Sequence, residues 1–114
     1  MKKYASLQKI QKRDGTIVPF DEKRIIRALT RATNAVNECT EVDIERISRR
    51  VLDSLLAVKK SHKEKNFIPS VELIQDLVEN ELIASNFKHT AKAYILYRKS
   101  HAEMREKVGF IPET

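Results

Sequence analysis

Apolar residues recur every three or four positions along most of the chain, which is the spacing of amphipathic helices. This spacing predicts four helices, of which the last is expected over residues 90–107. One side of each helix is then apolar and faces a shared core. We assign these apolar residues to packing in that core: Ile25, Leu29, Ile47, Val51, Ile74, Val78 and Ile95.

Residues that favour helix starts precede three of these segments. Asp21, Thr40 (or Asp43) and Ser70 carry side-chain oxygens that can accept hydrogen bonds from the first free amides of a helix. We therefore expect the first, second and third helices to begin at these positions.

The N-terminal part of the chain alternates with a period of two, which indicates extended strands. Two short strands are predicted, over residues 7–13 and 16–20. Asp14 and Gly15 lie between them, and an Asp-Gly pair favours a two-residue type I′ turn with positive φ at both positions. Pro19 marks an edge or the end of a strand.

The predicted fold class is therefore α+β, in which a small β-hairpin of two or three short strands covers a four-helix bundle. At 114 residues the chain is long enough for one core, and we place a single domain over residues 7–105. Residues 1–6 are expected to form an N-terminal tail. Residues 106–114 are expected to form a C-terminal tail or linker.

Composition excludes several classes of protein. Hydrophobic residues make up 41% and charged residues 33%, a globular balance. No apolar run is long enough for a membrane span or a signal peptide, so the cytoplasm is the expected compartment. The single cysteine, Cys39, cannot form an internal disulfide or a cysteine-rich zinc ribbon. Two glycines are too few for a glycine-rich phosphate loop.

Catalytic and metal sites are not predicted. The three histidines fall in different segments without ligand spacing, and each is expected at the surface. One face of the third predicted helix carries three carboxylates, a pattern that is usually a solvated face. These carboxylates are Glu72, Asp76 and Glu79.

The formal charge of +6 favours an anionic partner. Lys12 and Arg13 lie beside the predicted turn, and Arg24 lies in the first turn of the helix that follows. Because helix N-termini also attract anions, these three residues predict a phosphate site. The alternative is that they are ordinary solubilising charges.

Nucleic acid is the rival partner. A cluster at Arg46, Arg49 and Arg50 and a basic stretch over residues 59–65 have the charge to contact backbone phosphates. The aromatic residues are not interleaved with these basic residues, as a base-stacking platform requires. We therefore consider nucleic-acid binding unlikely but keep it as an alternative.

Three segments resemble the ATP-cone family, in the family's order and spacing. They read KRDGxxVPFD over residues 12–21, followed by RI at 24–25, then VExIQDxVE over 71–79 and AKAYIxYR over 91–98. Together they cover nearly the whole chain. The family is a regulatory nucleotide-binding module of ribonucleotide reductases.

The resemblance implies one nucleotide site and the residues that form it. Lys12 and Arg13 would hold phosphates or base edges, Ile10 would contact the base, and Asp21 would accept a hydrogen bond. Arg24 stands where the family commonly has lysine, which changes the donor geometry. The residues carried over are Ile10, Lys12, Arg13, Asp21, Arg24, Ile25, Val71, Glu72, Gln75, Arg98 and Lys99.

The function that the resemblance implies is non-catalytic sensing of ATP against dATP, with Mg²⁺ accompanying the triphosphate. The expected partner is a ribonucleotide reductase subunit, in cis or in trans, and the expected response is a change in oligomerisation. Two alternatives stay open. One is a nucleotide-responsive or nucleic-acid-binding transcriptional regulator, and the other is a structural module whose nucleotide site has decayed.

Overall fold

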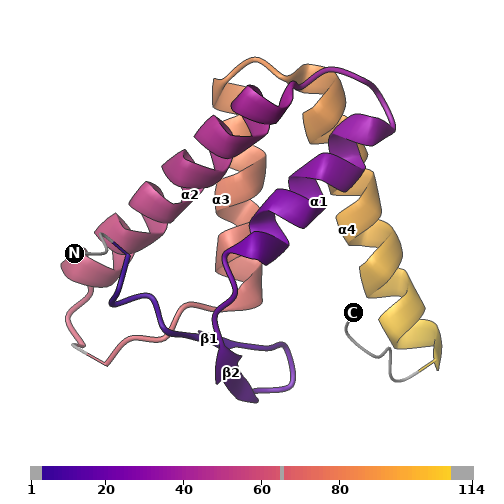
Figure 1. Ribbon diagram of the computed structural model, residues 1–114. Helices are drawn as coiled ribbons and strands as arrows, with labels where there is room; N and C mark the ends of the chain where they lie inside the picture. The colour runs from indigo at the N-terminus through magenta and orange to yellow at the C-terminus, as the bar shows by residue number, and fades with distance from the viewer. Residues whose placement is uncertain (1–3, 65, 109–114) are drawn as a thin grey trace.

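A computed structural model describes residues 4–64 and 66–108, with side chains described as far as residue 102. Within this part of the chain a hairpin precedes four helices (Figure 1), which confirms the predicted α+β fold. The elements are β1 (Lys9–Gln11), β2 (Ile17–Pro19), α1 (Lys23–Asn34), α2 (Glu41–Ser61), α3 (Val71–Ala84) and α4 (Lys88–Val108).

The hairpin is shorter than predicted, and its turn is of another type. Strands β1 and β2 are antiparallel, with Ile10 opposite Val18. The amide of Lys12 donates to the Thr16 carbonyl at 2.8 Å, so the loop holds three residues rather than two. Gly15 has φ of 89°, whereas Asp14 is not in the positive-φ region. The prediction of a type I′ turn was wrong, because a left-handed glycine after a tight turn closes a three-residue loop instead.

The start signals of α2 and α3 are confirmed. Thr40 accepts a hydrogen bond from the Asp43 amide at 3.1 Å, and Asp43 accepts one from the Thr40 amide at 3.0 Å. The two residues named as alternative caps thus form one reciprocal capping box. Ser70 accepts from the amide of Leu73 at 3.1 Å.

Helix α1 departs from its prediction by one residue. Its N-cap is Glu22, which makes no side-chain capping bond. The predicted cap, Asp21, lies one position earlier and accepts from the Lys23 amide at 3.0 Å. Asp21 therefore still satisfies an amide of the first turn, but from outside the helix.

Helix α4 begins two residues earlier than predicted and is capped from a distance. Its first residue follows Phe87, which has no oxygen to offer in its side chain. The carboxylate of Glu38, in the α1–α2 connection, accepts from the Thr90 amide at 2.7 Å and from the His89 amide at 3.4 Å. Burial raises the pKa of Glu38, but these bonds outweigh burial and leave the pKa lowered.

The core is formed by the apolar sides of the helices. Six of the seven residues that we assigned to it are at most 7% exposed. Ile95 was assigned wrongly, because its side chain is 40% exposed. Successive helical residues point about 100° apart. The buried residue of that turn is Tyr94, and Ile95 lies beyond the edge of the core-facing side.

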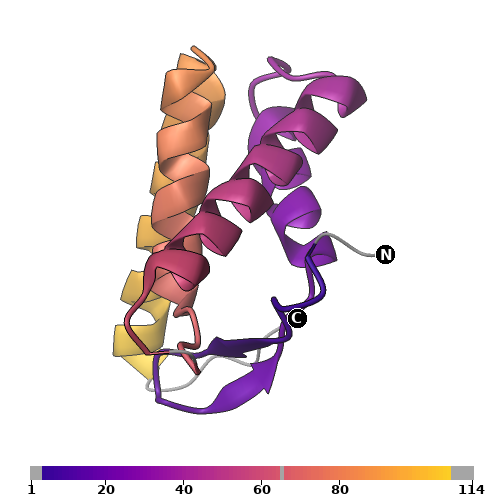
Figure 2. The same cartoon turned by 90° about the vertical axis from the view of Figure 1, so that its left-hand side faces the viewer.

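The hairpin lies across one end of the bundle, where α1 and α3 begin and α2 ends (Figure 2). The backbone attaches it there, because the amide of Gln11 donates to the Pro69 carbonyl at 2.9 Å. Gln11 also forms a parallel β-bridge with Ser70, the residue that caps α3. The start of α3 and the hairpin are therefore fixed to each other.

Candidate functional site

The tip of the hairpin contacts the first two turns of α3. From the loop, Arg13 places Nη1 at 3.4 Å from Oε2 of Glu72, and its Nη2 donates to Oε1 of Gln75 at 3.3 Å. The side chains of Arg13 and Glu72 are 35% and 41% exposed. Three of the predicted site residues thus meet, although the hairpin and α3 are more than 50 residues apart in the sequence.

A second arginine pairs with the same face of α3 further along the helix. Arg98 of α4 directs Nη1 to Oε1 of Glu79 at 2.7 Å and to Oδ1 of Asp76 at 2.9 Å. Burial lowers the pKa of Arg98, but the bonds to Glu79 and Asp76 outweigh it and leave the pKa raised. The guanidinium is therefore charged at any physiological pH.

The three carboxylates of α3 are thus not a plain solvated face. We name Glu72, Asp76 and Glu79 the acidic stripe. Two arginines from different elements form ion pairs with the acidic stripe, Arg13 from the hairpin and Arg98 from α4. The spacing of the carboxylates was visible in the sequence, but their partners were not, because these come from distant segments.

A cluster of aromatic and basic residues lies at the contact between α1 and α4. Arg31 of α1 donates from Nη1 to the hydroxyl of Tyr97 at 2.6 Å. The guanidinium carbon is also 5.2 Å from the centre of the Tyr97 ring. The ring of Tyr97 lies 4.2 Å from that of His101, one turn further along α4. Arg24 lies seven residues before Arg31 and so on the same side of α1.

This cluster was not predicted as a unit. His101 was expected as a lone surface residue, although the spacing of Tyr97 and His101 already placed both on one face of a helix. In the structure His101 is half-buried and contacts the tyrosine ring. A base or ribose could pack against these rings, beside the arginines.

The remaining predicted residues lie in different settings. In the hairpin, Ile10 is half-buried against the core and Lys12 is also half-buried. Asp21 binds Nη2 of Arg27 at 3.1 Å, and this bond, with the Lys23 amide, lowers the pKa of Asp21.

Several predicted residues lie apart from the contact between Arg13 and α3, among them Ile25, Lys99 and Arg24. Ile25 is only 4% exposed and belongs to the core. Lys99 is exposed on α4 next to Arg98. Val71 is half-buried in the first turn of α3, directly before Glu72, and Arg24 is exposed on α1.

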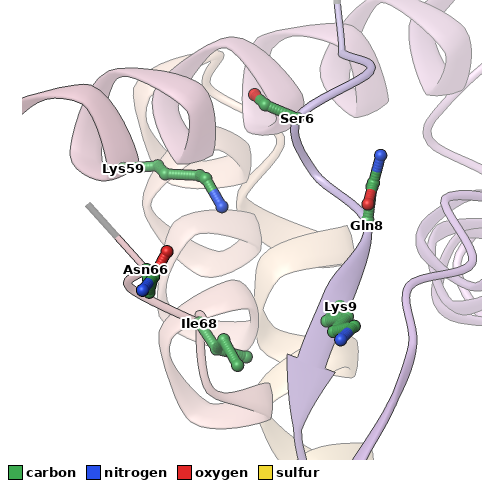
Figure 3. Close-up of a pocket in the computed structure, with 6 residues that line it drawn as sticks. All are labelled: Ser6, Gln8, Lys9, Lys59, Asn66 and Ile68. Atoms are coloured by element: carbon green, nitrogen blue, oxygen red, sulfur yellow. The ribbon is translucent and has the colours of Figure 1, made fainter. Parts of the chain in front are cut away.

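A cavity of about 260 Å³ lies elsewhere, between β1 and the C-terminal end of α2 (Figure 3). Lys59 points toward it and donates to the Phe67 carbonyl at 3.3 Å. None of the predicted site residues lines this cavity. Its lining consists of Ser6, Gln8, Lys9, Lys59, Asn66 and Ile68.

Two kinds of feature are absent from the described residues. No group of three or more histidine, cysteine, aspartate or glutamate side chains could hold a metal ion there. No described helix is both long enough and apolar enough to cross a membrane.

The fold is a small α+β domain in which a hairpin holds an arginine against a helical bundle. The comparison with protein families agrees, because the family described as the ATP cone domain matches residues 8–103. The chain therefore belongs to the ATP-cone family. It is a regulatory domain and not the catalytic part of the enzymes that it resembles.

Those enzymes are ribonucleotide reductases. Over 106 residues the chain is 38% identical to a vitamin B12-dependent ribonucleoside-diphosphate reductase of Thermoplasma acidophilum, covering 89% of this chain. It is 39% identical over 98 residues, or 85% of this chain, to the enzyme of that name in Mycobacterium tuberculosis. It is 34% identical over 96 residues, or 84% of this chain, to an anaerobic ribonucleoside-triphosphate reductase of Haemophilus influenzae. The match spans 13% of the length of each of these relatives.

Proposed function

We propose that this domain binds ATP and dATP, as magnesium complexes, at one site between the hairpin tip, α3 and α4. The nucleotide that occupies the site then sets the activity of a ribonucleotide reductase subunit, in cis or in trans, through a change in oligomerisation. The proposed compartment is the cytoplasm, where such a reductase would meet its effectors. The family supports nucleotide sensing in general, and the relatives' names support the reductase.

One observation carries the choice of site. Arg13 lies at the tip of a hairpin that is fixed to the start of α3, and Arg98 approaches the same face of α3 from α4. Guanidinium groups bind phosphates with two parallel hydrogen bonds, so this arrangement suits the triphosphate that ATP and dATP share. The aromatic cluster of Tyr97 and His101 adds a surface for the base or sugar.

A sensor must treat its two ligands differently. ATP and dATP differ by one hydroxyl, and a ligand that binds two conformations equally well shifts neither. The hydroxyl must therefore change a contact with residues that can move. Gln75 is the uncharged polar side chain of α3 next to the hairpin tip, and we propose it as that contact.

The nucleic-acid alternative relies in part on arginines of α2 that form ion pairs in the structure, as Arg13 also does. Arg46 pairs with Asp43, and Arg49 pairs with Glu45, so their charges are compensated within α2. Arg50 pairs with Glu81 of α3. The cluster that the sequence offered for backbone phosphates is therefore engaged with carboxylates.

Calorimetric titration of the chain with ATP and dATP, each with Mg²⁺, tests the proposal. The variant Lys12→Ala/Arg13→Ala should lose at least tenfold in affinity for both nucleotides, because two charged contacts are removed. The variant Arg49→Ala/Arg50→Ala is the matched control, because it also removes two positive charges but from α2. Equal losses of affinity in both variants would mean that the loss comes from the change in net charge and not from contacts at the hairpin. No saturable binding of either nucleotide to the unmodified chain would overturn the proposal.

A further inference from the structure

We propose that Glu72 is an internal competitor for the nucleotide, which holds Arg13 until a phosphate displaces it. This inference rests on the proposed function, since it assumes that Arg13 receives a phosphate. It assigns to Glu72 a role opposite to that of a ligand contact. The pair of Glu72 and Arg13, together with Gln75, is named the latch.

The geometry of Arg13 supports the competition. Its two terminal nitrogens both face α3, one toward Glu72 at 3.4 Å and one toward Gln75 at 3.3 Å. A phosphate that takes this pair of nitrogens must displace the contacts with α3. A phosphate that approaches from another side brings negative charge close to the Glu72 carboxylate, and like charges repel. Either way, the contact with Glu72 opposes binding.

The strength of the latch is suited to exchange. Both of its charged side chains are more than a third exposed, and exposed ion pairs contribute little to stability. Guanidinium–phosphate contacts are charge-assisted and can be two-pronged, so a triphosphate can replace the carboxylate. The latch is therefore strong enough to orient the hairpin tip and weak enough to open.

Arg98 forms shorter and less exposed ion pairs with the same helix, α3. Its side chain is 20% exposed, and one of its nitrogens binds two carboxylates at 2.7 and 2.9 Å. This leaves Nη2 and Nε of Arg98 outside those contacts. Arg98 is thus a fixed positive charge that can receive a phosphate without releasing α3, whereas Arg13 must be released.

Opening of the latch has a mechanical consequence. Arg13 joins the hairpin tip to α3, while the last residue of β1 is held separately by the bond from Gln11 to Pro69. Exchange of Glu72 for phosphate thus frees the loop after β1 while the end of β1 stays attached to α3. A change at the nucleotide site becomes a change in the position of an exposed loop, which a partner subunit can detect.

The test compares Glu72→Gln with Glu81→Gln in the full chain. Both variants remove one negative charge from α3, and both wild-type carboxylates lie 3.4 Å from an arginine nitrogen. Glu81 pairs with Arg50 of α2, on the side of α3 away from the hairpin tip. The comparison therefore separates loss of the latch from a change in net charge.

Two measurements are made on each variant. In calorimetry with MgATP, Glu72→Gln should bind about two- to fivefold more tightly than Glu81→Gln, the range expected when an exposed pair no longer competes. In hydrogen exchange without nucleotide, the amides of Gly15 and Thr16 should exchange faster in Glu72→Gln than in Glu81→Gln, because the tip is no longer held.

The outcomes separate the two proposals. Failure of the unmodified chain to bind either nucleotide defeats the proposed function, and the exchange experiment then still reports whether the latch holds the hairpin. Normal binding by the unmodified chain, with equal or weaker binding by Glu72→Gln than by Glu81→Gln, defeats the competition alone. Unchanged exchange at the hairpin tip defeats the latch.

Discussion

The helical bundle and the hairpin are stabilised in different ways. The bundle contains side chains that are less than 2% exposed, contributed by all four helices, such as Leu29, Leu55, Leu82 and Thr90. The residues of β1 and β2 are exposed or half-buried, and each strand has three residues. Burial of apolar surface therefore stabilises the bundle, whereas the hairpin is held by a few polar contacts and by the partial burial of Ile10 against the core.

Because of this difference, the bundle provides the stability of the domain and the hairpin is the part that can move. Segments with few buried contacts open at lower cost than the core to which they are attached. The hairpin can thus change position while α1 to α4 keep their packing. A regulatory domain needs such a division, because its ligand must alter one part without unfolding the rest.

The largest expected effect is in the bundle. Leu55→Ala should lower the free energy of unfolding by about 2–5 kcal/mol, because Leu55 is 1% exposed and its loss leaves a cavity. Urea denaturation followed by circular dichroism measures this change. Leu96→Ala is the matched control, since Leu96 is 57% exposed and its truncation should cost less than about 0.5 kcal/mol. Similar losses in the two variants would contradict the assignment of the core.

A smaller effect is expected at the cap of α4. Glu38→Gln should cost about 1 kcal/mol at neutral pH, because an amide oxygen replaces a carboxylate as acceptor for Thr90 and His89. The pKa of Glu38 is lower in the folded state than its ordinary value of about 4.5. Its contribution is therefore present above that value and is lost as the pH falls through the lower, folded pKa.

The acid limb of the stability curve measures this contribution. The difference in unfolding free energy between the unmodified chain and Glu38→Gln should shrink as the pH falls below about 4.5. Glu64→Gln controls for charge, because Glu64 is exposed in the connection after α2. A difference that stays constant with pH would show that Glu38 acts by packing alone.

The features that the sequence predicted well are local. Helix positions follow from periodicity, and the caps at Thr40 and Ser70 act within one turn of their own residue. The exposure of Ile95 was misjudged because apolar character alone does not say which side of α4 meets its neighbours. The type I′ turn failed because an Asp-Gly pair fits more than one loop length.

The features that the sequence could not predict join distant segments. Glu38 caps a helix that begins 50 residues later, and no local pattern marks it as a cap. The acidic stripe of α3 was visible, but Arg13 and Arg98 reach it only after the chain has folded. Resemblance to the family supplied the residues of the proposed site, whereas the structure supplied their partners.

The smallest expected effect on the stability of the bundle comes from the hairpin loop, at Gly15→Ala. Gly15 has φ of 89°, and the nearest atom to an added Cβ is Nε2 of Gln11 at 4.0 Å, so the cost is conformational strain and not a clash. We expect a loss of about 1 kcal/mol. This loss is an upper limit for the decrease in the unfolding free energy of the bundle, because a strained hairpin can open while the helices stay folded.

Hydrogen exchange distinguishes these two cases at Gly15. Hairpin amides such as that of Thr16 should lose more protection than core amides of α2, since strain in the loop favours local opening. Gly15→Asn is the matched variant, because asparagine adds a side chain but tolerates positive φ better than alanine, and it should restore most of the protection. Equal losses of protection in hairpin and helices would mean that they unfold as one unit. The hairpin could not then serve as the moving part, and a nucleotide signal would have to pass through the packing of α3 against α4.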